Sequence, residues 1–421
     1  MVDNSKKRLL KNTFFLYLLT FSSQVLGLIT IPYQTRVLSP EMYGVVGVAT
    51  STMTFLSLIL DFGLLLSATP KVASHQGDAA YLSELYGGVL AVKAGIATIC
   101  GVILGAVCLA LPYYRQYLAL YALYYFAYVL AAMLPDYLYR GLEQMKIITV
   151  RTVAIRLFAT AGTFIFLKSD ADVLALPICL LCGNFAALIA CFKYDRVNFA
   201  IQPILPSLEY LKNLARSSLP FFFSRVSSTV YSTANPIVLN AFYAGSPVIG
   251  LYTASEKFLS VSKSVVSPIA DSLYPYMVRN KDYRLVKRVL IFTAPFILIG
   301  ATVLFTFADQ ICVLIFGDGY VGAGSIVRCL LPAIMVIVPS YIICFPVLVP
   351  MGLSSQANFS NFIGVCVQLF SLALLILTGK LDVYTICMAT SAAEVSVFLY
   401  RLITILRHRG KKASADHALY R

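Results

Sequence analysis

Long apolar runs with few charges cover almost the whole of this sequence, and they limit the solvent in which the chain can fold. The first uncharged run begins at Asn12 and ends at Thr35, and similar runs follow until the basic C-terminal tail. A helix needs roughly 20 mostly apolar residues to cross the hydrocarbon core of a bilayer. With 59% hydrophobic and 12% charged residues, the chain leaves no room for a soluble domain between these runs. The sequence therefore predicts an integral membrane protein.

Charged residues and clusters of proline and glycine divide the apolar runs into about twelve predicted membrane helices. Their ranges are 12–36, 43–67, 82–111, 114–138, 147–167, 173–192, 214–243, 247–276, 286–308, 323–349, 357–378 and 383–406. The predicted fold class is therefore all-α, a polytopic membrane protein.

A repeated polar stripe suggests that the chain is duplicated. Small hydroxyl residues that end in an aspartate occur at helical spacing in 50–61 and again in 260–271. We therefore expect two lobes of six helices each, 1–200 and 201–421, around a central cavity. The polar segment 193–211 joins them.

The net charge of +14 comes from basic residues that lie mainly in the short segments between the apolar runs. Lysine and arginine in short loops mark the cytoplasmic side of a membrane protein, whereas a nucleic-acid-binding face would gather them on one surface. We therefore expect no nucleic-acid partner and both termini in the cytoplasm. The opposite side of the membrane keeps only Arg36, Arg115, Lys168 and Lys380.

Basic residues also fall inside the predicted helices, where each charge costs roughly 2.5 to 3.5 kcal/mol on insertion scales. They are Lys93, Arg156, Arg225, Lys257, Lys263, Arg328 and Arg401. Arg156 and Arg401 lie near helix ends, so we expect their side chains to reach the lipid headgroups. Lys93, Arg225 and Lys257 lie deeper, and we expect them to line a water-filled cavity or to form buried ion pairs.

Helical spacing supports the cavity for Lys257, because the polar stripe of 260–271 continues the same helix face. Close helix packing explains the serines of that stripe, but it does not explain a lysine. Buried acids are fewer, and each could carry a proton or a cation if ion movement drives the protein. The candidates for ion coupling are Asp61, Glu256, Asp271 and Glu394.

Residues suited to catalysis are scarce in this sequence. Its three histidines, His75, His408 and His417, fall in predicted cytoplasmic loops or in the tail, so we expect no metal site. The longest predicted external connection, 309–322, lacks a paired set of carboxylates for acid and base chemistry. No GxxxxGK[ST] phosphate loop occurs. We therefore expect no catalytic residues, no cofactor and no enzymatic activity.

Four segments resemble the bacterial O-antigen (Wzx-type) flippases, which belong to the superfamily of multidrug, oligosaccharidyl-lipid and polysaccharide exporters. The segments are 31–40 with Tyr43 and Gly44, 61–63 with 67–73, 140–146, and 316–317 with Tyr320. Pro70 is a departure, because the family more often has a basic residue at that place.

The resemblance implies a two-lobed fold with a central cavity, alternating access and coupling to an ion gradient. The implied cargo is a lipid-linked oligosaccharide, an O-antigen unit on undecaprenyl diphosphate. It would move from the cytoplasmic to the periplasmic leaflet of the bacterial inner membrane. The other implied partners are membrane lipids and the polysaccharide polymerase and chain-length proteins of the same pathway.

Deep cations suit this cargo, because they could replace the water that a diphosphate loses when it enters the membrane. We expect Arg225 and Lys257 to bind the headgroup. The supporting candidates for substrate binding are Lys93, Arg36, Lys263 and Arg328.

Two other functions compete with this interpretation. A multidrug-type antiporter of the same superfamily would export organic cations, and it should bury acids rather than bases. A membrane polysaccharide polymerase would extend a lipid-linked sugar chain, which incubation of the purified protein with such a substrate would detect.

Overall fold

The computed structural model describes the backbone of residues 2–419, and it describes their side chains except at 2–14, 16–17, 23, 223–224, 226–233, 275 and 409–419. Helices make up nearly all of this part, and it contains no strand. The chain divides into two compact units. Unit 1 comprises residues 1–229 with 240–246, and unit 2 comprises 230–239 with 247–421.

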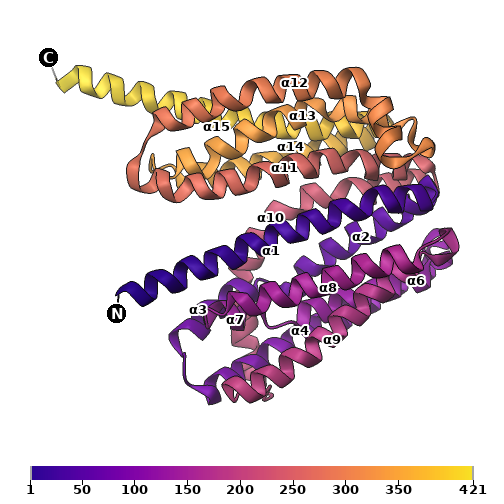
Figure 1. The fold of residues 1–421 in the computed structure, drawn as a ribbon, viewed down its shortest axis with the longest axis vertical. Coiled ribbons are helices and arrows are strands. Elements are labelled where there is room, and N and C mark those ends of the chain that lie inside the picture. The colour runs from indigo at the N-terminus through magenta and orange to yellow at the C-terminus, as the bar shows by residue number, and fades with distance from the viewer. Residues whose placement is uncertain (1, 420–421) are drawn as a thin grey trace. The chain divides into compact units, whose positions relative to one another are not determined.

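Unit 1 holds the helices from α1 to α9 and much of α10 (Figure 1). They are α1 (Val2–Val37), α2 (Pro40–Asp61), α3 (Leu64–Ser74), α4 (Ala79–Ala110), α5 (Pro112–Gln116), α6 (Leu118–Met133), α7 (Asp136–Gly141), α8 (Met145–Phe166), η1 (Asp170–Asp172), α9 (Ala175–Phe199) and α10 (Leu208–Tyr243). Within the unit, α8 packs against both α1 and α9, α6 packs against α9, and α3 packs against α7.

Unit 2 is built around α13 (Ala323–Ile343), which packs against three neighbouring helices, α11, α12 and α15 (Figure 1). The other elements are α11 (Pro247–Asn280), α12 (Tyr283–Phe316), η2 (Asp318–Tyr320), the π-helical turn η3 (Cys344–Leu348), α14 (Ser354–Leu377) and α15 (Val383–Leu419). In α13, 61% of the most apolar stretch is buried inside the protein, against 0% in α12. The apolar side chains in that stretch of α12 are thus available to lipid.

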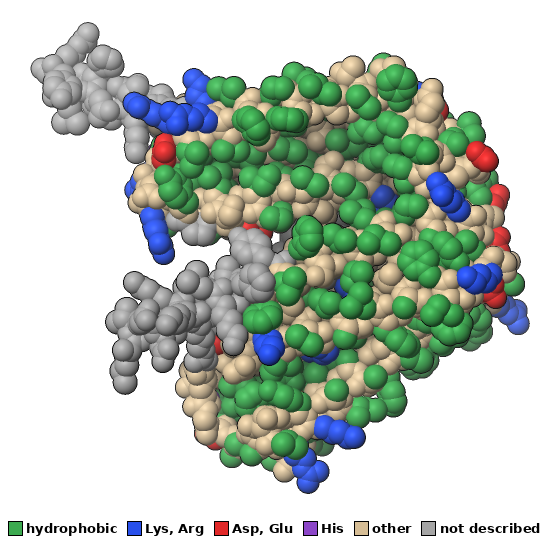
Figure 2. Space-filling view, in the orientation of Figure 1, with side chains coloured by type: hydrophobic (Ala, Val, Ile, Leu, Met, Phe, Trp, Pro, Cys, Tyr) green, Lys and Arg blue, Asp and Glu red, His purple; other side chains and the backbone are tan. Residues whose placement is uncertain are grey.

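Nine segments of the described part are long and apolar enough to cross a membrane. They are Pro40–Ser74, Ala79–Ala110, Leu118–Gly141, Met145–Phe166, Asp170–Phe199, Tyr283–Phe316, Ala323–Leu348, Ser354–Leu377 and Val383–His408. The helices α1, α10 and α11 contain 36, 36 and 34 residues. Each is therefore about 50 Å long, which exceeds the thickness of a bilayer core. Figure 2 shows hydrophobic side chains along the helices, as lipid contact requires.

The observed helices correspond to the predicted ranges, but some of their ends differ. The predicted helix 43–67 is divided, because Phe62 and Gly63 have φ angles of 48° and 72° and end α2 at Asp61. The predicted helix 114–138 is divided as well, since Leu134 and Pro135 separate α6 from α7. The helix predicted over 173–192 continues to Phe199 in α9. The lobes 1–200 and 201–421 and the central cavity stay predictions.

Candidate functional site

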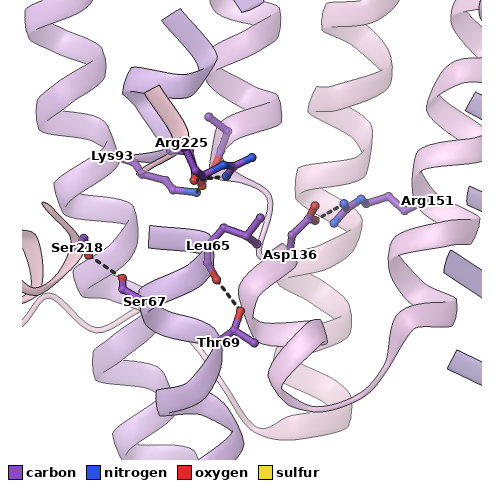
Figure 3. Close-up of polar contacts among 10 residues, drawn as sticks. Leu65, Ser67, Thr69, Lys93, Asp136, Arg151, Ser218 and Arg225 are labelled. Carbon is purple, nitrogen blue, oxygen red and sulfur yellow. Dashed lines mark hydrogen bonds and ion pairs between the residues drawn. The ribbon is translucent and has the colours of Figure 1, made fainter. Parts of the chain in front are cut away.

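Asp61 is the centre of a group of charged side chains in unit 1. Its Oδ2 atom accepts a hydrogen bond from Arg225 Nη1 at 2.7 Å, and its Oδ1 atom lies 3.8 Å from Lys93 Nζ. The Lys93 ammonium also donates a hydrogen bond to the backbone oxygen of Ala132 at 2.7 Å. Lys93 and Arg225 approach the same point from α4 and α10 (Figure 3). Two cations that the sequence predicts for substrate binding are thus brought together.

Two cations share one carboxylate in this group. Lys93 and Arg225 both pair with Asp61. The exposed fractions of the side chains are 5% for Lys93, 19% for Asp61 and 39% for Arg225. Keeping charges away from water is expensive, and charged residues within a membrane usually mark the path of a substrate or an ion.

A cavity of about 280 Å³ opens beside this group. Its lining residues are Ser57, Asp61, Leu65, Lys93, Tyr128, Ala131, Ala132, Leu134, Asp136 and Tyr137. A water molecule occupies about 30 Å³ in the liquid, so the cavity has room for several waters or for a small anionic group. Lys93 and Asp61 therefore both border this space.

The break between α2 and α3 allows Arg225 to reach Asp61. A Cβ atom on Gly63 would lie 2.7 Å from the backbone oxygen of Ser218 and 2.6 Å from the backbone nitrogen of Phe222. Only glycine permits this close approach of α10, and its positive φ angle suits glycine as well. A buried hydrogen bond of 2.6 Å between Ser67 and Ser218 holds the two helices together next to the break.

A second ion pair, between Asp136 and Arg151, extends the group of charges (Figure 3). Asp136 lines the same cavity as Lys93 and Asp61. The sequence does not predict a role for Arg151, because it falls among the loop arginines at the start of a predicted helix. Its distance of 15 positions from Asp136 has no helical regularity that would have indicated the pair.

In unit 2, two further basic candidates, Lys263 and Arg328, lie in separate ion pairs. Lys263 Nζ lies 2.8 Å from Glu394 Oε1, and the Glu394 side chain is 5% exposed. Arg328 donates hydrogen bonds to Asp309 at 2.7 Å and to the backbone oxygen of Phe305 at 2.9 Å. These cations therefore have carboxylate partners of their own.

The other candidates differ in how far they are buried. Glu256 and Lys257 are half-buried neighbours on α11. Asp271 is exposed on the same helix and accepts a hydrogen bond of 3.3 Å from Ser267. Arg36 is exposed in the last turn of α1. Arg36 belongs to unit 1, whereas Glu256, Lys257 and Asp271 belong to unit 2.

The prediction that Arg401 reaches the lipid headgroups is wrong. Its side chain is buried, with 5% of the residue exposed, and the guanidinium is held inside unit 2. It donates hydrogen bonds to Ser340 at 2.7 Å, to Ser360 at 2.8 Å and to Asn361 at 2.7 Å. These neutral acceptors lie on α13 and α14, so no spacing along α15 could indicate them. Arg156, by contrast, is exposed.

Two proteins described as candidate O-antigen transporters are similar in sequence to this chain. The protein from Shigella dysenteriae is 28% identical over 366 residues, which cover 85% of this chain and 91% of that protein. The protein from Escherichia coli (strain K12) is 24% identical over 290 residues, which cover 69% and 70% of the two chains.

Two solved structures show the fold. One is an inward-facing multidrug resistance transporter of the MATE family, in the MOP superfamily, with a TM-score of 0.70, 14% identity, and coverage of 94% of this chain and 96% of that one. The other is the lipid II flippase MurJ in an inward closed conformation, with a TM-score of 0.70, 14% identity, and coverage of 93% and 87%. The predicted all-α polytopic membrane fold is therefore confirmed. Residues 9–281, more than half of the chain, match the family of polysaccharide biosynthesis proteins, and the chain belongs to that family.

Proposed function

We propose that this protein moves a lipid-linked oligosaccharide of the O-antigen type across the bacterial cytoplasmic membrane by alternating access. The two candidate O-antigen transporters among its relatives support this substrate class. The observation that carries the proposal is the sharing of Asp61 by Lys93 and Arg225 beside a cavity.

Two cations that share one carboxylate suit a diphosphate headgroup. A diphosphate brings negative charges that can replace the carboxylate of Asp61 as the partner of both cations. Hydrogen bonds between such charged groups are each worth about 1.5 to 3 kcal/mol. In the absence of cargo, Asp61 keeps Lys93 and Arg225 in place and lowers the cost of burying them. We assign headgroup binding first to these two residues.

The remaining candidates keep secondary roles in the proposal. Lys257 is the cation of α11 that would meet the headgroup at another stage of transport, with Arg36, Lys263 and Arg328 as further contacts. Ion coupling is assigned to the acids Asp61, Glu256, Asp271 and Glu394. We also propose that the polysaccharide polymerase and the chain-length proteins take the product on the periplasmic side.

Complementation tests the assignment directly. Arg225→Ala and Lys93→Met are introduced into the protein and expressed in the host strain whose own copy has been deleted. Each should lower the amount of O-antigen at the cell surface by about 10- to 100-fold, the loss of one hydrogen bond between charged groups. The amount of each variant in the membrane is measured in parallel by immunoblotting.

Arg196→Ala is the matched control, because Arg196 is an exposed arginine of unit 1 outside the charged group. This variant should complement fully. Normal surface O-antigen in both Arg225→Ala and Lys93→Met would contradict the proposed function. Loss of export of an organic cation, with O-antigen unchanged, would favour the multidrug antiporter instead.

A further inference from the structure

A second buried acid in unit 1, Asp195, has no part in the proposed function. It lies on α9, 0% of it is exposed, and its Oδ1 atom accepts a hydrogen bond of 2.7 Å from the hydroxyl of Tyr139. Its Oδ2 atom has no hydrogen-bond partner. The buried hydroxyls of Tyr86 and Tyr137 have none either. Several polar atoms in one buried place are therefore left unsatisfied, which is uncommon and calls for an explanation.

The charged and titratable groups that face Asp195 come from four helices. They are Tyr86 on α4, Tyr137 and Tyr139 on α7, Arg151 on α8 and Cys191 on α9. Arg151 is the cation of this set, but it pairs with Asp136 and directs its other terminal nitrogen to Cys191 Sγ at 3.8 Å. Among the described residues, Asp195 forms no ion pair.

This environment disfavours a carboxylate in the arrangement observed. A buried charge without a counter-ion costs several kcal/mol, so a group of this kind takes up a proton and becomes neutral. The same environment holds donors that could stabilise the carboxylate after a small movement. The hydroxyls of Tyr86 and Tyr137 are unpaired, and the Nε atom of Arg151 is unpaired too. The surroundings of Asp195 can therefore hold its carboxyl group in the protonated or in the ionised form. A site that binds and releases a proton requires both.

We propose that Asp195 is a proton-binding site, which is protonated here and releases its proton when Arg151 turns from Asp136 to Asp195. In that step the O–H bond of the carboxyl group breaks, the electron pair stays on the carboxylate, and a water molecule accepts the proton. A groove of about 790 Å³ lies beside this region and is lined in part by Tyr139, Arg151, Cys191 and the exposed Tyr194.

The proton-binding site is connected to the cations that we assign to the headgroup, and in this respect the inference rests on the proposed function. Arg225, Asp61 and Lys93 are followed across the cavity by Asp136, Arg151 and Asp195, so the signs of charge alternate along the row. Ionisation of Asp195 adds one negative charge to this row, so proton release would favour departure of an anionic cargo.

Infrared spectroscopy of the purified full-length protein in nanodiscs tests the proton-binding site without any transport assay. The wild type at pH 5 should show the C=O stretching band of a protonated carboxyl group, and Asp195→Asn should remove intensity from it. Asp309→Asn is the matched control, because Asp309 is paired with Arg328 and its side chain is 42% exposed. That variant should leave the band unchanged.

Two further variants keep the test decisive if Asp195→Asn does not fold. Tyr139→Phe removes the donor to Oδ1 and should shift the band to higher wavenumber. Asp136→Asn frees Arg151 for Asp195 and should weaken the band. A wild-type band that is unaffected by every one of these changes would overturn the inference. The proposed function would still stand in that case if Arg225→Ala and Lys93→Met lowered surface O-antigen. If the band responds as expected but both of those variants show normal surface O-antigen, only the proposed function is contradicted.

Discussion

The substitution Asp61→Asn separates the charge of the shared acid from its shape. Asparagine keeps the size of the side chain, but it leaves Lys93 and Arg225 without a carboxylate. The free-energy cost is largest for Lys93, because only 4% of this residue is exposed and its remaining hydrogen bond is to a neutral backbone oxygen. At 3.8 Å, a pair of this kind is worth about 4 kcal/mol with an effective dielectric constant of about 20.

Removal of one partner from a buried ion pair typically costs about 3 to 5 kcal/mol, which agrees with that electrostatic value. The contribution of Arg225 is smaller, since water screens a side chain that is 39% exposed. We therefore expect Asp61→Asn to lower the free energy of unfolding by about 3 to 5 kcal/mol. Replacing the buried cation as well, in Asp61→Asn with Lys93→Met, should recover about 2 kcal/mol or more.

Unfolding by sodium dodecyl sulfate in mixed micelles measures these differences, with thiol labelling as the signal. The chain suits this signal because seven of its ten free cysteines are buried and become reactive only on unfolding. Asp309→Asn serves as the control, and it should change the free energy of unfolding by no more than about 1 kcal/mol. The reasoning fails if Asp61→Asn is as stable as the wild type, or if the double variant is no more stable than Asp61→Asn alone.

Three further predictions concern the helix break, the buried guanidinium and the topology. Gly63→Ala should lower the free energy of unfolding by about 2 to 5 kcal/mol in the same assay, because residue 63 has a positive φ angle and a Cβ atom there would meet the backbone of α10. Gly105→Ala is the control, and it should be neutral or slightly stabilising because Gly105 has open space around it. Arg401→Lys should cost about 1 to 3 kcal/mol, because an ammonium cannot reach the separate acceptors of the planar guanidinium, and an unchanged value would show that these hydrogen bonds contribute nothing. Reporter proteins fused after Gly77, Lys146 and Asn280 should all give a cytoplasmic signal. One periplasmic signal would contradict the predicted orientation.

Hydropathy predicted the helices because the bilayer imposes one requirement on every span, a stretch of about 20 apolar residues. The helix ends were harder to predict, because they depend on single residues. Phe62 adopts a positive φ angle of 48° that is unusual for a large aromatic residue, so nothing before Gly63 indicated the end of α2. The polar residues after 192 predict a connecting segment, but α9 continues through them to Phe199 and contains Asp195.

That the candidate site contains buried cations was easier to predict than which residues pair with them. The cost of a buried charge drew attention to Lys93 and Arg225 without any structure. Their partner could not be predicted, since Asp61 and Arg225 are 164 positions apart and no local pattern connects them. The same reason explains why the pairing of Lys263 with Glu394 was not predicted. Long-range contacts of this kind depend on how the helices pack, and packing is decided by apolar side chains that look alike in sequence.

Asp61 occupies the last position of α2, where the free carbonyl groups of the helix carry a partial negative charge. A carboxylate is unfavourable at this end by about 0.3 to 1 kcal/mol, and no basic residue in the last turn of α2 offsets it. Lys93 and Arg225 thus serve, from two other helices, as the positive cap that α2 lacks. An anion that draws them away would expose the end of α2 to its own dipole, so that cargo binding would also loosen the junction between α2 and α3.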